Sequence, residues 1–114
     1  MGYDITHIDS YSGWDRGHSI DQQYDILVRY VGDTTFTSLT SVSSTNNSGG
    51  SNPHARRVSI TEDETGLLAG GVDAIQFDIT NGATAYREFD VFGTATVPEP
   101  ASLSLIGLLA VGAL

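Results

Sequence analysis

The sequence contains no cysteine and no lysine. Without cysteine the chain can form no disulfide bond, no thiolate nucleophile and no cysteine-ligated zinc site. Five arginines face fourteen acidic residues, so the formal net charge is −9. Phosphate backbones would repel such a chain, and no basic stripe offsets the repulsion. These shortages exclude disulfide frameworks and cysteine chemistry, and we expect no nucleic-acid partner.

Patterns for export, metal binding and catalysis are also missing. The first ten residues lack a basic region followed by an apolar stretch, so we expect no signal peptide in this chain. The histidines, His7, His18 and His54, are scattered and unpaired, and Glu62–Glu64 lacks the alternating ligands of a calcium loop. Neither a nucleophile elbow nor a phosphate-binding glycine loop follows a strand pattern. We therefore expect no enzyme, no catalytic residue, no metal and no cofactor.

Alternation of apolar and polar residues is the main pattern of the body. It is clearest in Tyr24–Tyr30, which would place Tyr24, Ile26, Val28 and Tyr30 on one face of a strand. Ile5 and Ile8 are three residues apart, which breaks strict alternation and predicts a bulge. Further strands are expected at Phe36–Val42, Val58–Ile60, Ala74–Ile79 and Tyr86–Phe92. Ile75, Phe77 and Ile79 would share one face, as would Phe89 and Val91.

Turn signals separate these strands. Gly32-Asp33-Thr34 and Asn81-Gly82 predict hairpin turns, and the polar stretch Ser43–His54 predicts an exposed loop. No long pattern with helical spacing occurs in the body. Short strands at regular spacing predict an all-β fold, an antiparallel sandwich.

The chain ends in an uncharged apolar segment, Ala101–Leu114, preceded by Pro98 and Pro100. A membrane-spanning helix needs about 20 apolar residues, so this segment is short for a complete span. A buried amphipathic helix is the alternative, but the leucines surround the helix axis and leave no polar face. The two prolines prevent a helix from continuing back into the body.

Val97-Pro98-Glu99-Pro100 followed by a Leu/Gly/Ala-rich segment resembles the PEP-CTERM sorting signal of Gram-negative bacteria. In that family the motif precedes a transmembrane segment and a terminal basic cluster. The resemblance implies processing by an exosortase, passage through the inner membrane, and delivery to the cell surface or the extracellular matrix. No basic residue follows Leu114, which removes the positive charge that would hold the end in the cytoplasm.

A second resemblance covers the body, from about residue 3 to residue 93. The successions Ile8–Trp14, Gln22–Ile26, Phe36–Leu39 and Arg87–Gly93 are similar to those of discoidin-like (F5/8 type C) domains, which are galactose-binding-like jelly rolls. The resemblance implies a domain at 1–93, a linker at 94–100 and a helical sorting or transmembrane segment at 101–114. The first strands of the jelly roll are not recognised, so we interpret the chain as part of a longer precursor.

One stretch combines an aromatic platform with charged neighbours. Tyr11, Trp14, Asp15, Arg16 and His18 are the candidate ligand-binding residues, because a sugar ring stacks on an aromatic ring while charged groups bond its hydroxyls. The alternative is structural: Trp14 packs into the sandwich, and Arg16 pairs with Asp15 or with Asp21.

Three functions remain open. The first is a sorted surface or matrix protein whose domain serves adhesion or carbohydrate contact, with an exosortase and polysaccharide as partners. The second is a carbohydrate-binding module of a larger enzyme. The third is a membrane-anchored structural protein that is never processed. The tail favours the first.

Overall fold

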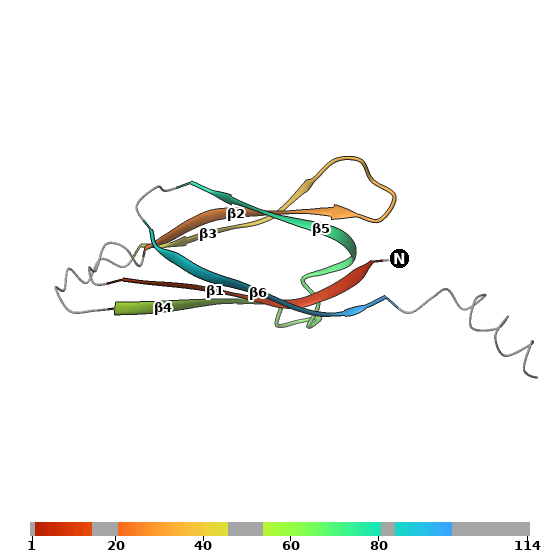
Figure 1. Cartoon of the computed structure of the whole chain (residues 1–114). Helices are drawn as coiled ribbons and strands as arrows, with labels where there is room; N and C mark the ends of the chain where they lie inside the picture. Colours follow the sequence, from red (N-terminus) through yellow and green to blue (C-terminus); the bar gives the residue numbers. More distant parts are fainter. Residues whose placement is uncertain (1, 15–20, 46–53, 81–83, 97–114) are drawn as a thin grey trace, which may run out of the picture.

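The computed structural model describes residues 2–14, 21–45, 54–80 and 84–96. These residues form strands and turns and contain no helix, which confirms the all-β prediction. None of them therefore forms a helix that could cross a membrane. Figure 1 shows the six strands, β1 (Tyr3–Trp14), β2 (Gln22–Tyr30), β3 (Thr37–Ser44), β4 (His54–Thr61), β5 (Ala69–Ile79) and β6 (Tyr86–Ala95).

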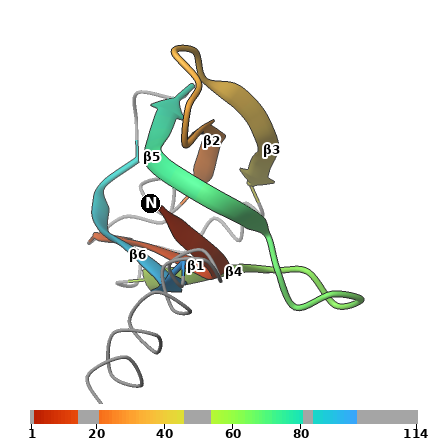
Figure 2. The same ribbon diagram turned by 90° about the vertical axis from the view of Figure 1, so that its right-hand side faces the viewer.

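The strands form one curled antiparallel sheet in the order β3-β2-β5-β1-β4, with β6 on the other edge of β1. Two halves of the sheet face each other, β2, β3 and β5 in one and β1, β4 and β6 in the other (Figures 1 and 2). β5 joins them, because Ala69 pairs with Ile5 of β1 while Ile79 pairs with Tyr24 of β2. Gly71 lies where β5 bends and has a positive φ of 66°, a conformation that glycine adopts without steric cost.

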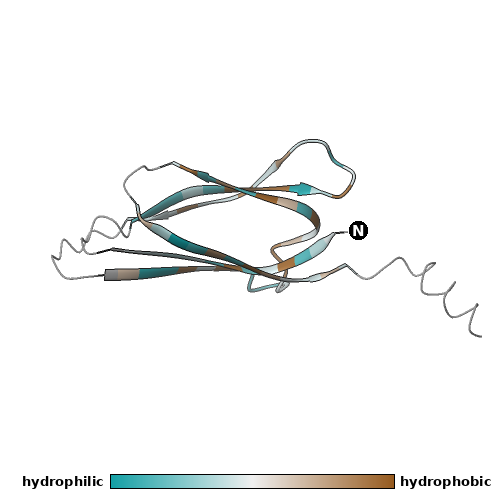
Figure 3. Ribbon diagram, in the orientation of Figure 1, coloured by the Kyte–Doolittle hydropathy of each residue, from teal (hydrophilic) through white to brown (hydrophobic). Residues whose placement is uncertain are grey.

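The core lies between the two halves and follows the predicted alternation. Tyr24, Ile26 and Val28 of β2 are almost fully buried, while the residues between them are partly exposed. Polar and apolar bands accordingly alternate along the strands in Figure 3. Four residues from the other half and from the start of β5 complete the buried apolar core, namely Ile5, Ile8, Ala69 and Val72.

Alternation predicts burial less well near one side of the fold. Ile75, Phe77 and Phe89 pack against the core, as expected from their strand faces. Ile79 and Val91 lie on the same predicted faces but are 42% and 40% exposed. A position on the same strand face as a core residue therefore does not ensure burial in this fold.

The predicted bulge at the start of the chain is confirmed. The pairing of β1 with β6 shifts register between Ile5 and His7. Thr6 is the extra residue, and its hydroxyl donates a hydrogen bond to the Phe92 carbonyl oxygen, 3.2 Å away. This shift allows both Ile5 and Ile8 to point into the core.

The turn at Gly32-Asp33 is also confirmed. Gly32 has a φ of 93°, and the Asp33 N–H donates to the Tyr30 carbonyl oxygen at 2.9 Å. The predicted loop Ser43–His54 is shorter than expected, because β3 extends to Ser44 and β4 begins at His54. Asn81-Gly82 and most of that loop lie outside the described residues, as do the motif Val97–Pro100 and the apolar segment 101–114.

The first and the last described residues of the chain, Gly2 and Thr96, are hydrogen-bonded to each other. Beyond Gly93, β6 continues to Ala95, and the Thr96 N–H donates to the Gly2 carbonyl oxygen at 2.7 Å. The Gly2 N–H in turn donates to the Thr96 hydroxyl at 2.9 Å. The sheet therefore includes at least two residues beyond the expected boundary at 93.

Candidate functional site

The structure places one of the five predicted ligand-binding side chains in a surface hollow. Tyr11 lies in β1, and Trp14 is the last residue of that strand, although only its backbone is described. Asp15, Arg16 and His18 lie outside the described residues. Tyr11 is therefore the described residue around which the candidate site lies.

β1 is the central strand of its half of the sheet, and Tyr11 lies on its outer face. Ser10 and Ser12 on either side are buried toward the interior, so the side chain between them points outward. Tyr11 is paired with Arg57 of β4 on one edge and with Glu88 of β6 on the other. Three strands thus bring an arginine, an aromatic ring and a carboxylate into one row.

A hollow of about 430 Å³ lies near the end of β1 that contains Tyr11 and Gly13. Gly13 of β1 is paired with Ala55 of β4, and these small residues leave space beside the larger side chains. The lining consists of Tyr11, Ser12, Gly13, Ala55, Arg56, Arg57, Arg87 and Glu88. A partly exposed aromatic ring beside guanidinium and carboxylate groups can stack on a sugar ring, while the charged groups bond the hydroxyl groups of the sugar.

A second irregularity in β6 positions Arg87 at the hollow. The register with β1 shifts between Tyr11, which pairs with Glu88, and Ser12, which pairs with Tyr86. The extra residue is Arg87, whose Nε donates to the Gly13 carbonyl oxygen at 3.3 Å. Bulges commonly redirect a side chain in this way, and here two consecutive residues of β6 line the same hollow.

A buried polar network supports the strands beneath the hollow. The Gln22 side chain accepts a hydrogen bond from the Ser10 hydroxyl and donates to the Ser12 hydroxyl at 3.0 Å. The hydroxyls of Ser10 and Tyr24 lie 2.6 Å apart. Burial raises the pKa of Tyr24 above its ordinary value, so this hydroxyl stays neutral and able to donate. These groups tie β1 to β2 across the interior.

Arg56 also joins the two halves of the sheet at this end. Its guanidinium donates to the Ser44 carbonyl oxygen of β3 at 2.5 Å and lies 3.4 Å from an Asp21 carboxylate oxygen. Gln22 donates to the Arg56 carbonyl oxygen at 3.3 Å. Asp21, one of the two partners suggested for Arg16, therefore pairs with Arg56.

The next row along β1 is acidic. Asp9 is 5% exposed, and it accepts hydrogen bonds from the Ser59 hydroxyl at 2.6 Å and from the His7 ring at 2.9 Å. The Ser59 bond, followed by His7 and by the charge of Arg57, holds the pKa of Asp9 below its ordinary value. Within the described ranges, no cluster of three or more His, Asp or Glu residues could hold a metal ion.

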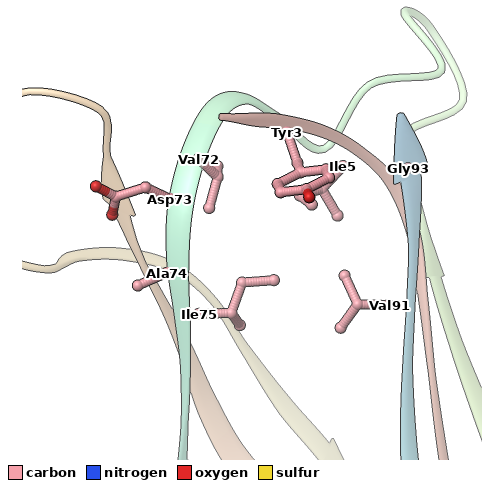
Figure 4. A pocket seen from close by; sticks show the side chains of 8 residues that line it. All are labelled: Tyr3, Ile5, Val72, Asp73, Ala74, Ile75, Val91 and Gly93. Atoms are coloured by element: carbon pink, nitrogen blue, oxygen red, sulfur yellow. The ribbon is translucent and has the colours of Figure 1, made fainter. Parts of the chain in front are cut away.

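A second hollow, of about 350 Å³, lies between β5 and β6 (Figure 4). Its lining is mostly apolar, with Tyr3, Ile5, Val72, Ile75 and Val91 around the space. Asp73 points away from it in Figure 4 and pairs instead with Arg29 at 2.8 Å. Because no set of polar groups converges on this hollow, it is a weaker candidate for a specific ligand.

Sequence reasoning missed Arg57, Arg87 and Glu88. Their positions in alternating segments were a usable signal, since outward-facing residues of strands are candidates for binding. Comparison of the chain with protein-family models, with curated proteins and with solved structures finds no match.

Proposed function

We propose that this chain belongs to an exported bacterial protein that is sorted through Val97-Pro98-Glu99-Pro100 and residues 101–114. The observation that supports this proposal is the order of three features along the chain. An acidic all-β body is followed by the Pro-Glu-Pro motif and then by an uncharged apolar segment. An exosortase recognises the motif at the inner membrane, and the apolar segment enters the membrane as a helix. The mature protein then resides at the cell surface or in the extracellular matrix.

In this proposal the curled sheet binds carbohydrate, and this binding mediates adhesion. Two features support that role: the row Arg57–Tyr11–Glu88 and the hollow beside it. The finer identity of the fold is part of the same proposal, namely a discoidin-like jelly roll of the galactose-binding-like kind. Trp14, Asp15, Arg16 and His18, which follow Tyr11 closely in the sequence, remain candidate ligand-binding residues in this proposal.

Sorting is tested by mass spectrometry of the exported protein. The whole chain is placed behind a cleavable export signal in a Gram-negative host, with and without its exosortase. We expect an exported form that ends near Pro98–Pro100 in the host with exosortase, and an intact membrane-bound form without it. A Pro98→Ala, Pro100→Ala variant should resemble the exosortase-free case. An intact apolar tail on protein released to the surface would contradict sorting.

Carbohydrate contact is tested separately with the folded chain on a glycan array. Tyr11→Ala should remove binding while the far-UV circular dichroism spectrum is retained. Tyr3→Ala is the matched control, because Tyr3 is an exposed tyrosine, 57% exposed, near the other end of the same strand. Equal losses in both variants would argue against a site at Tyr11.

A further inference from the structure

Positive charge is concentrated at the candidate hollow. The chain has five arginines and a net charge of −9, yet three of those arginines, Arg56, Arg57 and Arg87, line this single hollow. Glu88 is the one carboxylate in the same lining. The Arg56 guanidinium pairs with Asp21, so Arg57 and Arg87 against Glu88 leave one excess positive charge in the lining, which attracts anionic groups over short distances.

Arg57 is the arginine best placed to receive such a group. It is exposed on the outer face, beside the Tyr11 ring in the neighbouring strand. Within the described ranges it forms no ion pair, whereas Arg29 pairs with Asp73 and Arg56 with Asp21. A guanidinium presents a planar fork of donors that matches the two oxygens of a carboxylate.

The two residues paired with Tyr11 differ in charge, which gives a bound ring a direction. Arg87, the other charged residue of β6 at the hollow, donates to the Gly13 carbonyl oxygen. Arg57 lies on the β4 side and Glu88 on the β6 side. A carboxylate over the β6 side would meet Glu88 and be repelled. A ligand that stacks on Tyr11 therefore gains most when its anionic group lies over β4 and its hydroxyl groups donate to Glu88.

We infer that the hollow binds a carboxylated polysaccharide, a polymer of uronic acid residues, in preference to neutral sugar polymers. This inference rests on the proposed carbohydrate contact and adds its charge class. The sugar ring stacks on Tyr11, Arg57 binds the carboxylate, and Glu88 accepts from a hydroxyl group.

The test compares a charged sugar polymer with its uncharged ester and with a polyanion of different chemistry. Isothermal titration calorimetry of the folded chain uses polygalacturonate, its fully methyl-esterified form, and polyphosphate as a polyanion without sugar rings. We expect polygalacturonate to bind roughly tenfold more tightly than the ester, because a charge-assisted hydrogen bond is lost. Raising the salt concentration from 50 to 500 mM should reduce that preference through screening. Polyphosphate should bind weakly, since it offers nothing to stack on Tyr11.

Two variants assign the preference to one residue. Arg57→Gln should lower the affinity for polygalacturonate to about that of the same variant for the ester, so that the preference for the acid is lost. Arg29→Gln, which removes an equal charge from the other half of the sheet, should leave the preference intact.

The outcomes separate the two proposals. Equal binding of acid and ester by the unaltered chain would overturn the uronate inference and leave carbohydrate contact standing. Tight binding of polyphosphate would overturn it as well, in favour of charge alone. Failure of the folded chain to bind either sugar polymer would overturn the uronate inference, and carbohydrate contact as such would be decided by the glycan array.

Discussion

The aromatic rings of Phe77 in β5 and Phe89 in β6 have centroids 4.3 Å apart. The two strands are not neighbours in the described sheet, so this contact joins the facing halves through side chains instead of backbone hydrogen bonds. Tyr24 meets both rings edge-on, at 5.9 Å from Phe77 and 5.4 Å from Phe89. The cluster limits how far β5 and β6 can separate.

Phe89→Ala should therefore lower the free energy of unfolding by about 3 kcal/mol, the lower end for a buried phenylalanine, because Phe89 is partly buried. Urea denaturation followed by tyrosine fluorescence measures the change. Phe92→Ala is the control on the same strand, since Phe92 is 43% exposed and stacks only on His7 among the described rings. It should cost less than about 1 kcal/mol, and similar losses would refute the role of the cluster.

Gln22→Leu should cost about 2 kcal/mol in the free energy of unfolding, because it removes the partner of two buried serine hydroxyls. The measurement is chemical denaturation in urea. Gln23→Leu changes the adjacent, partly exposed side chain and keeps the backbone N–H that donates to the Tyr86 hydroxyl at 2.9 Å. We expect that variant to stay close to the unaltered protein. If Gln22→Leu were equally stable, the network would have no stabilising role.

Gly93→Ala should lower the melting temperature by about 10 °C, as expected for a cost near 2 kcal/mol in a small domain. A Cβ at this position would lie 2.1 Å from the Asp4 carbonyl oxygen of β1, so β6 would have to move away from its partner. Differential scanning calorimetry measures the shift. Thr94→Ala, at an exposed position next to Gly93, should change the melting temperature little, and an unchanged Gly93→Ala variant would disprove the close approach.

Asp9 should make stability depend on pH in the acid range. Its pKa is lowered in the folded protein, mainly by the Ser59 hydrogen bond. The unfolded state therefore binds more protons in that range, so the stabilising contribution is present above about pH 4 and is lost as pH falls through the folded-state pKa. His7, Arg57 and Asp90 are the other ionisable groups beside this carboxyl.

Asp9→Asn should flatten this acid dependence in urea denaturation curves recorded from pH 6 to pH 2. Asp33→Asn removes the same formal charge from the β2–β3 turn, far from this row, and should leave the Asp9 contribution in place. If the free energy of unfolding fell equally steeply at low pH in the unaltered protein and in Asp9→Asn, another group would be the cause of the acid dependence.

Local patterns predicted much of the sheet. Tyr24, Ile26 and Val28 could be placed in the core because a strand with one buried face repeats every two residues. The bulge after Ile5 and the turn at Gly32 left equally local signals. The exposure of Ile79 and Val91 could not be predicted, because alternation reports which face a residue occupies and not how closely the facing half of the sheet covers it.

The site was harder to predict because its residues come together only in the tertiary structure. Tyr11 was identified from its neighbours in sequence, but Arg57 and Glu88 reach it through pairings between distant segments. Such pairing depends on register, and a shift of one residue would turn these side chains to the other face. The bulge at Arg87 changes the register once more, and nothing in Tyr86–Phe92 alone indicates it.

The hydrogen bonds between Gly2 and Thr96 determine which end of the sheet carries both ends of the described chain. They fix the start and the end of the described sheet at one pole, whereas Tyr11 and Gly13 lie near the far end of β1, roughly 30 Å away for an extended strand of this length. A chain held through its C-terminal end thus turns its cationic hollow away from the point of attachment. The length of β1 separates the two poles, so Arg57, Arg87 and Tyr11 lie at the pole opposite Gly2 and Thr96.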